Sequence, residues 1–310
     1  MYRIRFHGRG GQGIKTASRI LGTALFLEGF EVQDAPRYGA ERRGAPIFAY
    51  VRADDAPIHE RGVIHRPDLV VVADDTLLTI TPAQVLEGIA SASVVLIYSV
   101  RSESWWRQQF PQIGQMVVLR PDRGTGVGLP AGIFCAGAAA ALLGTVSREA
   151  LVKAVEEELA AHDSALVESN RQAVLAAYEA VSVSHGMVHS GVPQPVAKTA
   201  APAWIDVSRD AVDIAAPVIH AGTTSRLVKT GLWRTRRPVI DKEKCRRCLQ
   251  CCAWCPEGGI LVGEDGFPMI DYEHCKGCLV CVAQCPFKAI RAIPEAQAKE
   301  ERDAQASDRQ

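Results

Sequence analysis

The stretch "CRRCLQCCAWCP", residues 245–256, is the most specific part of this sequence, and its spacing recurs in "CKGCLVCVAQCP" at residues 275–286. In each copy three cysteines stand at intervals of three residues. A fourth follows four residues later, directly before a proline. Nine of the ten cysteines of the chain lie between Cys245 and Cys285. Cysteines gathered in this way indicate metal ligation in a reducing compartment, because structural disulfides are rare there and would not need this clustering.

The C-x2-C-x2-C-x3-C-P run is the ligand pattern of bacterial ferredoxins. Three closely spaced thiolates hold one [4Fe-4S] cluster, and the fourth reaches the other cluster. We therefore predict two clusters whose ligands cross between the repeats and tie the two halves together. The first set is Cys245, Cys248, Cys251 and Cys285, and the second is Cys275, Cys278, Cys281 and Cys255.

Two zinc knuckles are the alternative to clusters, because CxxC pairs also ligate zinc. Eight cysteines in a doubled run with its prolines disfavour that reading. Cys252 has no place in the pattern, and Cys135 lies in the apolar run "GIFCAGAAAALLG". Both are predicted to be buried side chains and not ligands, since free cysteine packs as a small apolar residue.

The composition is that of an ordinary globular protein, with 310 residues and 47% hydrophobic residues, enough for two domains. Lysine plus arginine and aspartate plus glutamate both number 35, so the net charge is zero. No global field therefore attracts nucleic acid or an anionic membrane surface. No apolar run reaches the roughly 18 residues of a membrane span, and no signal peptide is apparent. We expect a cytoplasmic protein without membrane insertion.

Residues 1–185 are predicted to form an α/β domain with a mostly parallel sheet, because several apolar runs are nearly continuous and suit strands covered on both faces. Residues 186–237 are predicted to be an extended linker, 238–295 a small α+β ferredoxin domain, and 296–310 a disordered tail. Ser147 is a predicted helix cap. The predicted strands are 2–6, 47–52, 69–73, 94–100 and 116–119, and the predicted helices are 14–28, 131–143, 148–160 and 168–182.

The segment "FHGRGGQGIKTA", which begins at Phe6, has the spacing G-x-G-x-x-G between a predicted strand and a predicted helix. An acid also stands near the position of a ribose ligand, at Glu31 or Asp34. Glycines before a helix present backbone N–H groups that attract phosphate, whatever molecule carries it. NAD is thus one candidate among several. His7, beside these glycines, is expected to be structural.

Several stretches resemble one enzyme family. "IRFHGRGGQG", "YGAERRGAPIFAYVRADDAPI" and "PDLVVVADDTLL" are similar to the γ subunit of the 2-oxoacid:ferredoxin oxidoreductases, the pyruvate oxidoreductase family. "KTGLWRTRRPVIDKEKC", "CPEGGI" and "DGFPMIDYEHCKGC" are similar to the two-cluster ferredoxin subunit, δ, of the same family. The resemblance covers residues 1–185 and 228–293 and implies a fusion of γ and δ.

In that family the 2-oxoacid, thiamine diphosphate and Mg sit in separate α and β subunits. This sequence lacks the G-D-G and N-N elements that would hold them, and its Glu264-Asp265-Gly266 lies where the family has a hairpin. The resemblance therefore implies an electron-transfer subunit that passes electrons through two [4Fe-4S] clusters to ferredoxin or another acceptor. No catalytic residue is predicted in this chain. The substrate could be pyruvate, 2-oxoglutarate, oxalate, or a branched-chain or aromatic oxoacid, usually with CoA.

The family resemblance also changes the interpretation of the glycine loop. The loop is predicted to hold a CoA phosphate or to order a subunit interface, and two arginines nearby could make bidentate contacts with an anion or pair with a partner subunit. The alternative function is a stand-alone NAD(P)-binding iron-sulfur reductase. The candidate residues are Gly8, Gly10, Gly11, Gln12, Gly13, Arg42 and Arg43.

Overall fold

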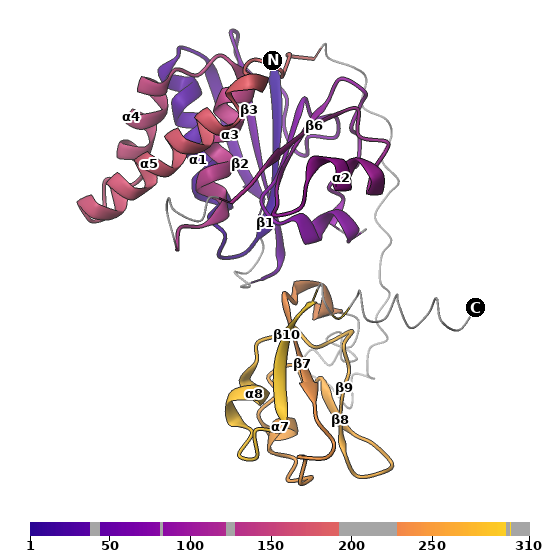
Figure 1. The fold of residues 1–310 in the computed structure, drawn as a ribbon. Coiled ribbons are helices and arrows are strands. Elements are labelled where there is room, and N and C mark those ends of the chain that lie inside the picture. The colour runs from indigo at the N-terminus through magenta and orange to yellow at the C-terminus, as the bar shows by residue number, and fades with distance from the viewer. Residues whose placement is uncertain (38–43, 81–82, 122–127, 192–227, 296–297, 299–310) are drawn as a thin grey trace, which may run out of the picture. The chain divides into compact units, whose positions relative to one another are not determined.

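The computed structural model describes residues 1–37, 44–80, 83–121, 128–191, 228–295 and 298. The chain divides into two compact units, Met1–Gln194 and Pro195–Gln310, which are coloured from indigo to pink and from orange to yellow in Figure 1. In the described residues no helix is both long enough and apolar enough to cross a bilayer.

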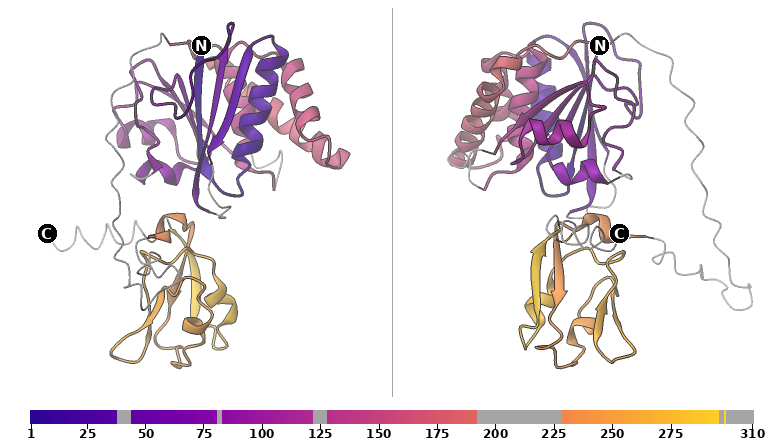
Figure 2. Two further views of the ribbon diagram at one scale, coloured as in Figure 1. Left: turned by 180° about the vertical axis from the view of Figure 1, so that it is seen from behind. Right: turned by 45° about the vertical axis from the view of Figure 1, so that its right-hand side comes forward.

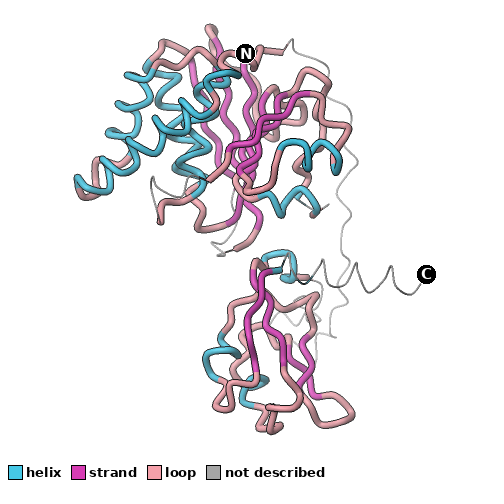
Figure 3. Tube along the Cα trace, viewed as in Figure 1, coloured by secondary structure: helices cyan, strands magenta, loops and turns pink. Residues whose placement is uncertain are grey.

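A six-stranded sheet forms the centre of unit 1, with strand order β2-β3-β1-β4-β5-β6. Its strands are magenta in Figure 3. β1 pairs in parallel with β4, and the parallel pairing continues through β5 to β6, whereas β3 is antiparallel to both β1 and β2. Of the strands described in this sheet, β3 is thus the one that runs against the others, and the predicted mostly parallel α/β sheet is confirmed. The strands are β1 (Tyr2–Arg9), β2 (Glu31–Arg37), β3 (Pro46–Asp54), β4 (Leu69–Val72), β5 (Val94–Tyr98) and β6 (Gln115–Leu119).

Two strand features differ from the sequence prediction. β2 was not predicted, because "EVQDAPR" has neither a continuous apolar run nor a regular alternation, and it lies at the edge of the sheet. β1 continues to Arg9 instead of ending at Phe6, because its pairing with β3 continues to Arg9 opposite Pro46. Gly8 is therefore part of a strand and not of the loop.

Helices cover both faces of the sheet (Figures 1 and 2). The larger core joins one face to α1 (Ile14–Leu27), α3 (Ala131–Leu143), α4 (Arg148–Glu158) and α5 (Ser164–Ala180). The other face packs against α2 (Glu103–Gln109) and the 3-10 turn η1 (Asp75–Thr79). Neither of these two was predicted, since both are shorter than the windows in which helical periodicity can be recognised.

The helix ends follow from capping side chains. Ser147 Oγ accepts a hydrogen bond from Ala150 N at 3.1 Å, so the predicted cap of α4 is confirmed. Asp163 Oδ1 accepts from Leu166 N at 2.8 Å, and α5 accordingly begins at Ser164, four residues before the predicted start at 168. α3 has the predicted bounds and is buried from Gly132 to Leu143. Its small residues permit close packing: a Cβ at Gly137 would lie 2.1 Å from Val174 O of α5.

A row of buried arginines lies on the second face of β1, where side chains alternate with the apolar core residues. Arg5 is 4% exposed, and its guanidinium donates hydrogen bonds to the carbonyl oxygens of Ile64, Val85 and Glu87 at 3.1, 2.7 and 2.8 Å. Burial lowers the pKa of Arg5 to about 10, so it remains charged at neutral pH. These contacts satisfy the backbone of loops that have little regular structure of their own.

Unit 2 is built from two halves related by a displacement of thirty positions. Asp241 N donates to Ala289 O at 2.8 Å, and its equivalent Asp271 N donates to Gly259 O at 3.0 Å. Each strand pair joins one half to the other, β7 (Arg236–Ile240) with β10 (Ile290–Pro294) and β8 (Ile260–Val262) with β9 (Pro268–Ile270). The hairpin expected around Glu264-Asp265-Gly266 is confirmed by the β8–β9 pair. The remaining described elements are η5 (Thr230–Trp233), α7 (Gln250–Ala253) and α8 (Val280–Gln284).

The predicted linker is described only in part. Val188 is buried in the core of unit 1, and its N–H donates to Leu142 O at 2.9 Å. Unit 1 therefore extends a few residues beyond the predicted boundary at 185. Residues 192–227, most of the predicted linker, and 299–310, most of the predicted tail, lie outside the described residues.

Candidate iron-sulfur centre and glycine loop

Each cysteine run curls because two of its residues adopt the left-handed backbone conformation. In the first run these are Arg247 and Leu249, with φ of 57° and 56°. In the second they are Gly277 and Leu279, with φ of 71° and 64°. Leu249 and Leu279 immediately precede α7 and α8, which carry the third cysteine of each run. The turn thus places the first three cysteines of each run around a common space.

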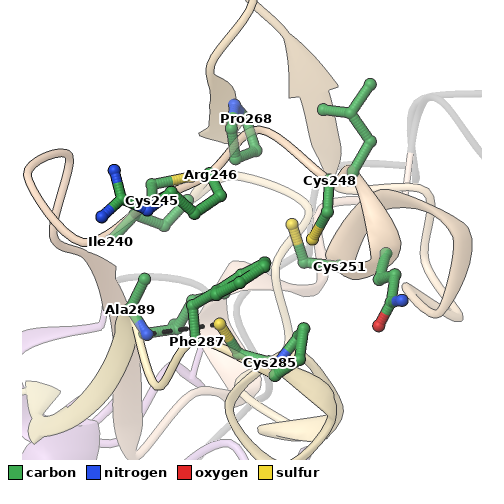
Figure 4. Close-up of a pocket in the computed structure, with 13 residues that line it drawn as sticks. Ile240, Cys245, Arg246, Cys248, Cys251, Pro268, Cys285, Phe287 and Ala289 are labelled. Carbon is green, nitrogen blue, oxygen red and sulfur yellow. Dashed lines mark hydrogen bonds between the residues drawn. The ribbon is translucent and has the colours of Figure 1, made fainter.

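The eight cysteines line two separate pockets. The first is shown in Figure 4, where the labelled cysteines lie around a common space that Phe287 enters. In both pockets three cysteines come from one repeat and one from the other. The first pocket contains Cys245, Cys248, Cys251 and Cys285, and the second contains Cys275, Cys278, Cys281 and Cys255.

The chemistry of these pockets fits iron-sulfur clusters. Each offers four thiol donors, and Ala289 N donates a hydrogen bond to Cys285 Sγ at 3.3 Å (Figure 4), a contact of the kind that tunes cluster potentials. Burial raises the pKa of Cys251 to about 12 and that of Cys281 to about 11. Binding iron must therefore displace thiol protons at neutral pH. Among the described residues, no three His, Cys, Asp or Glu side chains converge closely enough to hold a single metal ion.

The two remaining cysteines lie where apolar side chains would. Cys135 is fully buried in α3, and burial raises the pKa of its thiol, as expected of an inert core residue. Cys252 is partly buried against the small core of unit 2, but it lines neither pocket.

The apolar core of unit 2 is small. The buried members of its main cluster are Ile260 and Ile290 together with the predicted cluster ligands Cys251 and Cys281, and the described residues of the unit add Ala289, Ile293 and Ala298. The ligand positions are thus the centre of the unit, and little apolar surface is available to hold it together without them.

A buried ion-pair network near the second pocket was not predicted from the sequence. Arg234 and Arg237 both bind the carboxylate of Glu295, with Arg234 Nε to Glu295 Oε2 at 2.6 Å and Arg237 Nη2 to Glu295 Oε1 at 2.6 Å. Arg234 Nη1 also donates to Cys275 O at 2.7 Å. Burial alone would raise the pKa of Glu295, but the hydrogen bonds from the two arginines outweigh it and hold the pKa below its usual value. The sequence carries no signal for this network, because its partners are 58 and 61 positions apart.

The side chains of the glycine loop are used within unit 1. Arg9 is 2% exposed, and its Nε donates to Asp74 Oδ2 at 3.1 Å. Gln12 Nε2 donates to the same oxygen at 2.8 Å, while Gln12 Oε1 accepts from Arg9 N at 2.7 Å. These contacts fasten the loop to the residues that follow β4.

The glycines of the loop allow the backbone to turn and pack. Gly13 caps α1 in the left-handed conformation, with φ of 72°. The start of α3 lies against the turn, since Gly132 N donates to Gln12 O at 2.9 Å and a Cβ on Gly132 would lie 2.6 Å from Gly13 O. Arg42 and Arg43 lie outside the described residues.

The arrangement of the strands disfavours a dinucleotide site. In such sites the acid that binds the ribose stands at the end of the second strand. That strand lies directly beside the first strand, which leads into the glycine loop. Here β3 separates β1 from β2, so Glu31 and Asp34 are two strands away from β1. Burial also raises the pKa of Asp34. His7 is 1% exposed, packs edge-on against Phe48, and has a pKa far below its usual value because of burial.

Two family models match this chain, one in each unit. The model described as pyruvate ferredoxin/flavodoxin oxidoreductase matches residues 3–180, more than half of the chain. The chain belongs to this family. A second model, the 4Fe-4S dicluster domain, matches residues 237–286 and supports iron-sulfur clusters over zinc. The chain therefore joins a γ-type oxidoreductase domain to a ferredoxin-like domain, as the resemblance implied.

Relatives of this oxidoreductase family align with the first unit. The pyruvate/ketoisovalerate oxidoreductases common subunit gamma of Thermococcus kodakarensis is 37% identical over 182 residues, which are 57% of this chain and 96% of that protein. The pyruvate synthase subunit PorC of Methanothermobacter marburgensis is 34% identical over 191 residues, 62% of this chain and 100% of that protein. A crystal structure of a pyruvate oxidoreductase subunit from Thermotoga maritima, 30% identical, covers 57% of this chain and 95% of its own with a TM-score of 0.47.

Proposed function

We propose that this chain is the electron-transfer subunit of a 2-oxoacid:acceptor oxidoreductase, in which separate α and β subunits bind thiamine diphosphate, Mg and the oxoacid. The observation that carries the proposal is the joining of a γ-type oxidoreductase domain to a unit whose eight cysteines line two pockets. Oxidative decarboxylation of a 2-oxoacid with CoA gives acyl-CoA, CO2, one proton and two electrons. Two one-electron carriers in one polypeptide match that output.

In this proposal the cysteines hold the clusters as two interlocked sets. Cys285 completes the first set and Cys255 the second, so each half of unit 2 depends on a ligand from the other. When bound, the clusters accept and release one electron at a time. The chain's own residues position them: the left-handed turns curl each run, and the N–H of Ala289 points at Cys285 Sγ.

The glycine loop is assigned a supporting role. Its two polar side chains are used to build the turn, as the contacts of Arg9 and Gln12 with Asp74 indicate. A contribution to binding a CoA phosphate would then come from backbone N–H groups at the start of α1. An ordered interface with a partner subunit is the alternative role. The NAD(P) reductase is not favoured, because β3 separates the two strands that such a site needs side by side.

Rapid mixing of the native complex with a 2-oxoacid tests the proposal. Anaerobic purification of the untagged chain should yield α and β partners that contain thiamine diphosphate. Adding pyruvate, 2-oxoglutarate, a branched-chain oxoacid, oxalate or phenylglyoxylate, with and without CoA, should then reduce the clusters within one turnover, as measured by freeze-quench EPR. Purification without such partners, or clusters that stay oxidised with every oxoacid, would refute it.

A further inference from the structure

The thirty-residue repeat makes each cluster pocket a control for the other. Arg247 and Gly277 occupy the same position, before the second cysteine of each run, and both have left-handed backbones with φ of 57° and 71°. Lys288 and Gly258 are likewise equivalent, three residues after the last cysteine of each run, with φ of 50° and 61°. The backbone is therefore the same in both halves, and the side chains differ.

Glycine is the residue that suits these two backbone positions. A side chain in the left-handed conformation brings Cβ too close to the following carbonyl oxygen, so lysine and arginine are rarely found there. The two glycines, Gly277 and Gly258, adjoin ligands of the second pocket and avoid this strain, whereas Arg247 and Lys288 adjoin ligands of the first pocket and keep it at both positions. Strain retained at an exposed position points to a use for the side chain itself.

The two cations directly follow Arg246 and Phe287, which line the first pocket, and with them form an exposed rim. We call Arg246, Arg247, Lys288 and Phe287 the basic rim. All four are exposed, Phe287 by 46%, and the pocket's ligand Cys248 is exposed beside them. None of the three cations forms an ion pair with a residue in the described part of the chain. Arg247 donates a long hydrogen bond of 3.4 Å to the carbonyl oxygen of Asp265.

The second pocket is lined by two charged side chains, Lys276 and Glu257, and they pair with each other. Lys276 binds Glu257 at 2.6 Å, and both side chains are partly buried. Arg234 binds Glu295 close by. At Gly277, where the first pocket has an exposed arginine, a Cβ would lie 2.5 Å from Arg236 O, so the chain itself covers this edge. Among the described residues, Arg246, the cation that lines the first pocket, thus has no ion pair, whereas its equivalent Lys276 at the second pocket is paired.

We propose that the basic rim is the docking surface for an acidic electron-carrier protein, and that electrons leave this chain from the cluster of Cys245, Cys248, Cys251 and Cys285. The inference rests on the proposed electron-transfer function and adds the exit and the charge of the partner. Exposed unpaired cations contribute little to stability, but they raise the rate at which an anionic protein docks. A cluster held by four thiolates is itself anionic, so without the rim it would repel such a partner. Exposed arginine and aromatic side chains are also typical of the centres of interfaces.

Stopped-flow electron transfer from the full chain tests this directly and needs no α or β subunit. The chain is reduced anaerobically, freed of reductant, and mixed with a strongly acidic plant-type [2Fe-2S] ferredoxin as the probe; one electron leaves a [4Fe-4S] cluster and reduces the probe. The double variant Arg247→Gly/Lys288→Gly places at each position the glycine found at the equivalent position beside the second pocket, Gly277 or Gly258, so it should fold and bind iron normally. Lys153→Gln/Lys229→Gln removes the same charge elsewhere and is the matched control.

The rim variant should lose about tenfold in second-order rate constant at low ionic strength, and the difference should shrink as salt screens the charges. The control pair should behave as the unmodified chain. A neutral nitroimidazole acceptor should be reduced at the same rate by all three proteins, which excludes a change in cluster potential as the cause.

Three results would overturn the inference. The first is an equal rate constant for the rim variant and the unmodified chain. The second is a rate constant of the unmodified chain that does not fall as salt is added. The third is a loss of rate in the control variant as large as that in the rim variant. Each can occur while oxoacid still reduces the clusters of the native complex, so failure here is distinguishable from failure of the proposed function. A rim variant that no longer joins the α and β subunits, with its ferredoxin rate unchanged, would show instead that the rim is a subunit contact.

Discussion

Replacing Cys278 with alanine should remove one cluster and loosen both halves of unit 2. Cys278 is one of the four cysteines of the second pocket, and Cys255 of the same pocket comes from the other repeat. Losing this cluster therefore releases a connection between the halves as well as a local ligand. The matched control is Cys252→Ala. Cys252 is next to Cys251 in the sequence, but its thiol lines neither pocket.

The magnitude follows from how little else holds the unit. Its buried isoleucines are Ile260, Ile290 and Ile293, which contribute about 2 kcal/mol each. A structural metal site in a small domain contributes on the order of 10 kcal/mol to folding, because the site does not exist in the unfolded chain. Losing a cluster thus outweighs the apolar core. Unit 1 has a separate and much larger core and should remain folded.

Anaerobic iron analysis and scanning calorimetry measure both effects. The unmodified chain should contain about eight irons, Cys278→Ala about four or fewer, and Cys252→Ala about eight. The thermal transition of unit 2 should disappear or move far down in Cys278→Ala, while that of unit 1 stays in place. An unchanged iron content in Cys278→Ala, or an equal loss in Cys252→Ala, would refute the ligand assignment.

Three further predictions concern unit 1. Arg5→Met should destabilise it by about 2–4 kcal/mol in denaturant titrations. Three carbonyl oxygens lose their donor, two of them in buried hydrogen bonds, and removal of a buried charge offsets part of this loss. Replacing the half-exposed Arg19 with Met should cost less than about 1 kcal/mol, and equal losses in the two variants would contradict this. Burial by itself raises the pKa of Glu60, but hydrogen bonds from Arg3 and Arg52 outweigh burial and lower the pKa. Ionised Glu60 therefore stabilises the folded chain above the pKa of Glu60 in the unfolded chain. This stabilisation is lost as the pH falls through the lower pKa of the folded chain. Glu60→Gln should accordingly be less stable than the unmodified chain at pH 7 and equally stable once Glu60 is protonated. A stability difference that does not change with pH would argue against the ion pairs of Glu60 with Arg3 and Arg52. Anaerobic titration with NADH should leave the cluster absorbance of the isolated chain unchanged, because β3 separates β1 from β2; bleaching by NADH would restore the reductase alternative.

The sequence by itself determined the features that depend on local spacing. The cysteine intervals indicated which thiols line a common pocket, and the apolar runs of β4, β5 and α3 indicated buried elements, because a pattern over a few residues reports directly on a strand or a helix. The glycine loop shows the limit of such patterns. Its spacing fits a dinucleotide site, yet the order of the strands, set by pairing between distant segments, disfavours one.

Only the tertiary structure decided which partner each charged side chain binds. Arg5 binds carbonyl oxygens about 60 to 80 positions away, and Arg234 binds a glutamate 61 positions away. The same holds for the basic rim: the sequence contains Arg247 and Lys288, but their exposure and the absence of ion pairs with described residues follow from how the two halves of unit 2 pack. Partner choice over such separations is set by the packing of whole elements, which no local pattern records.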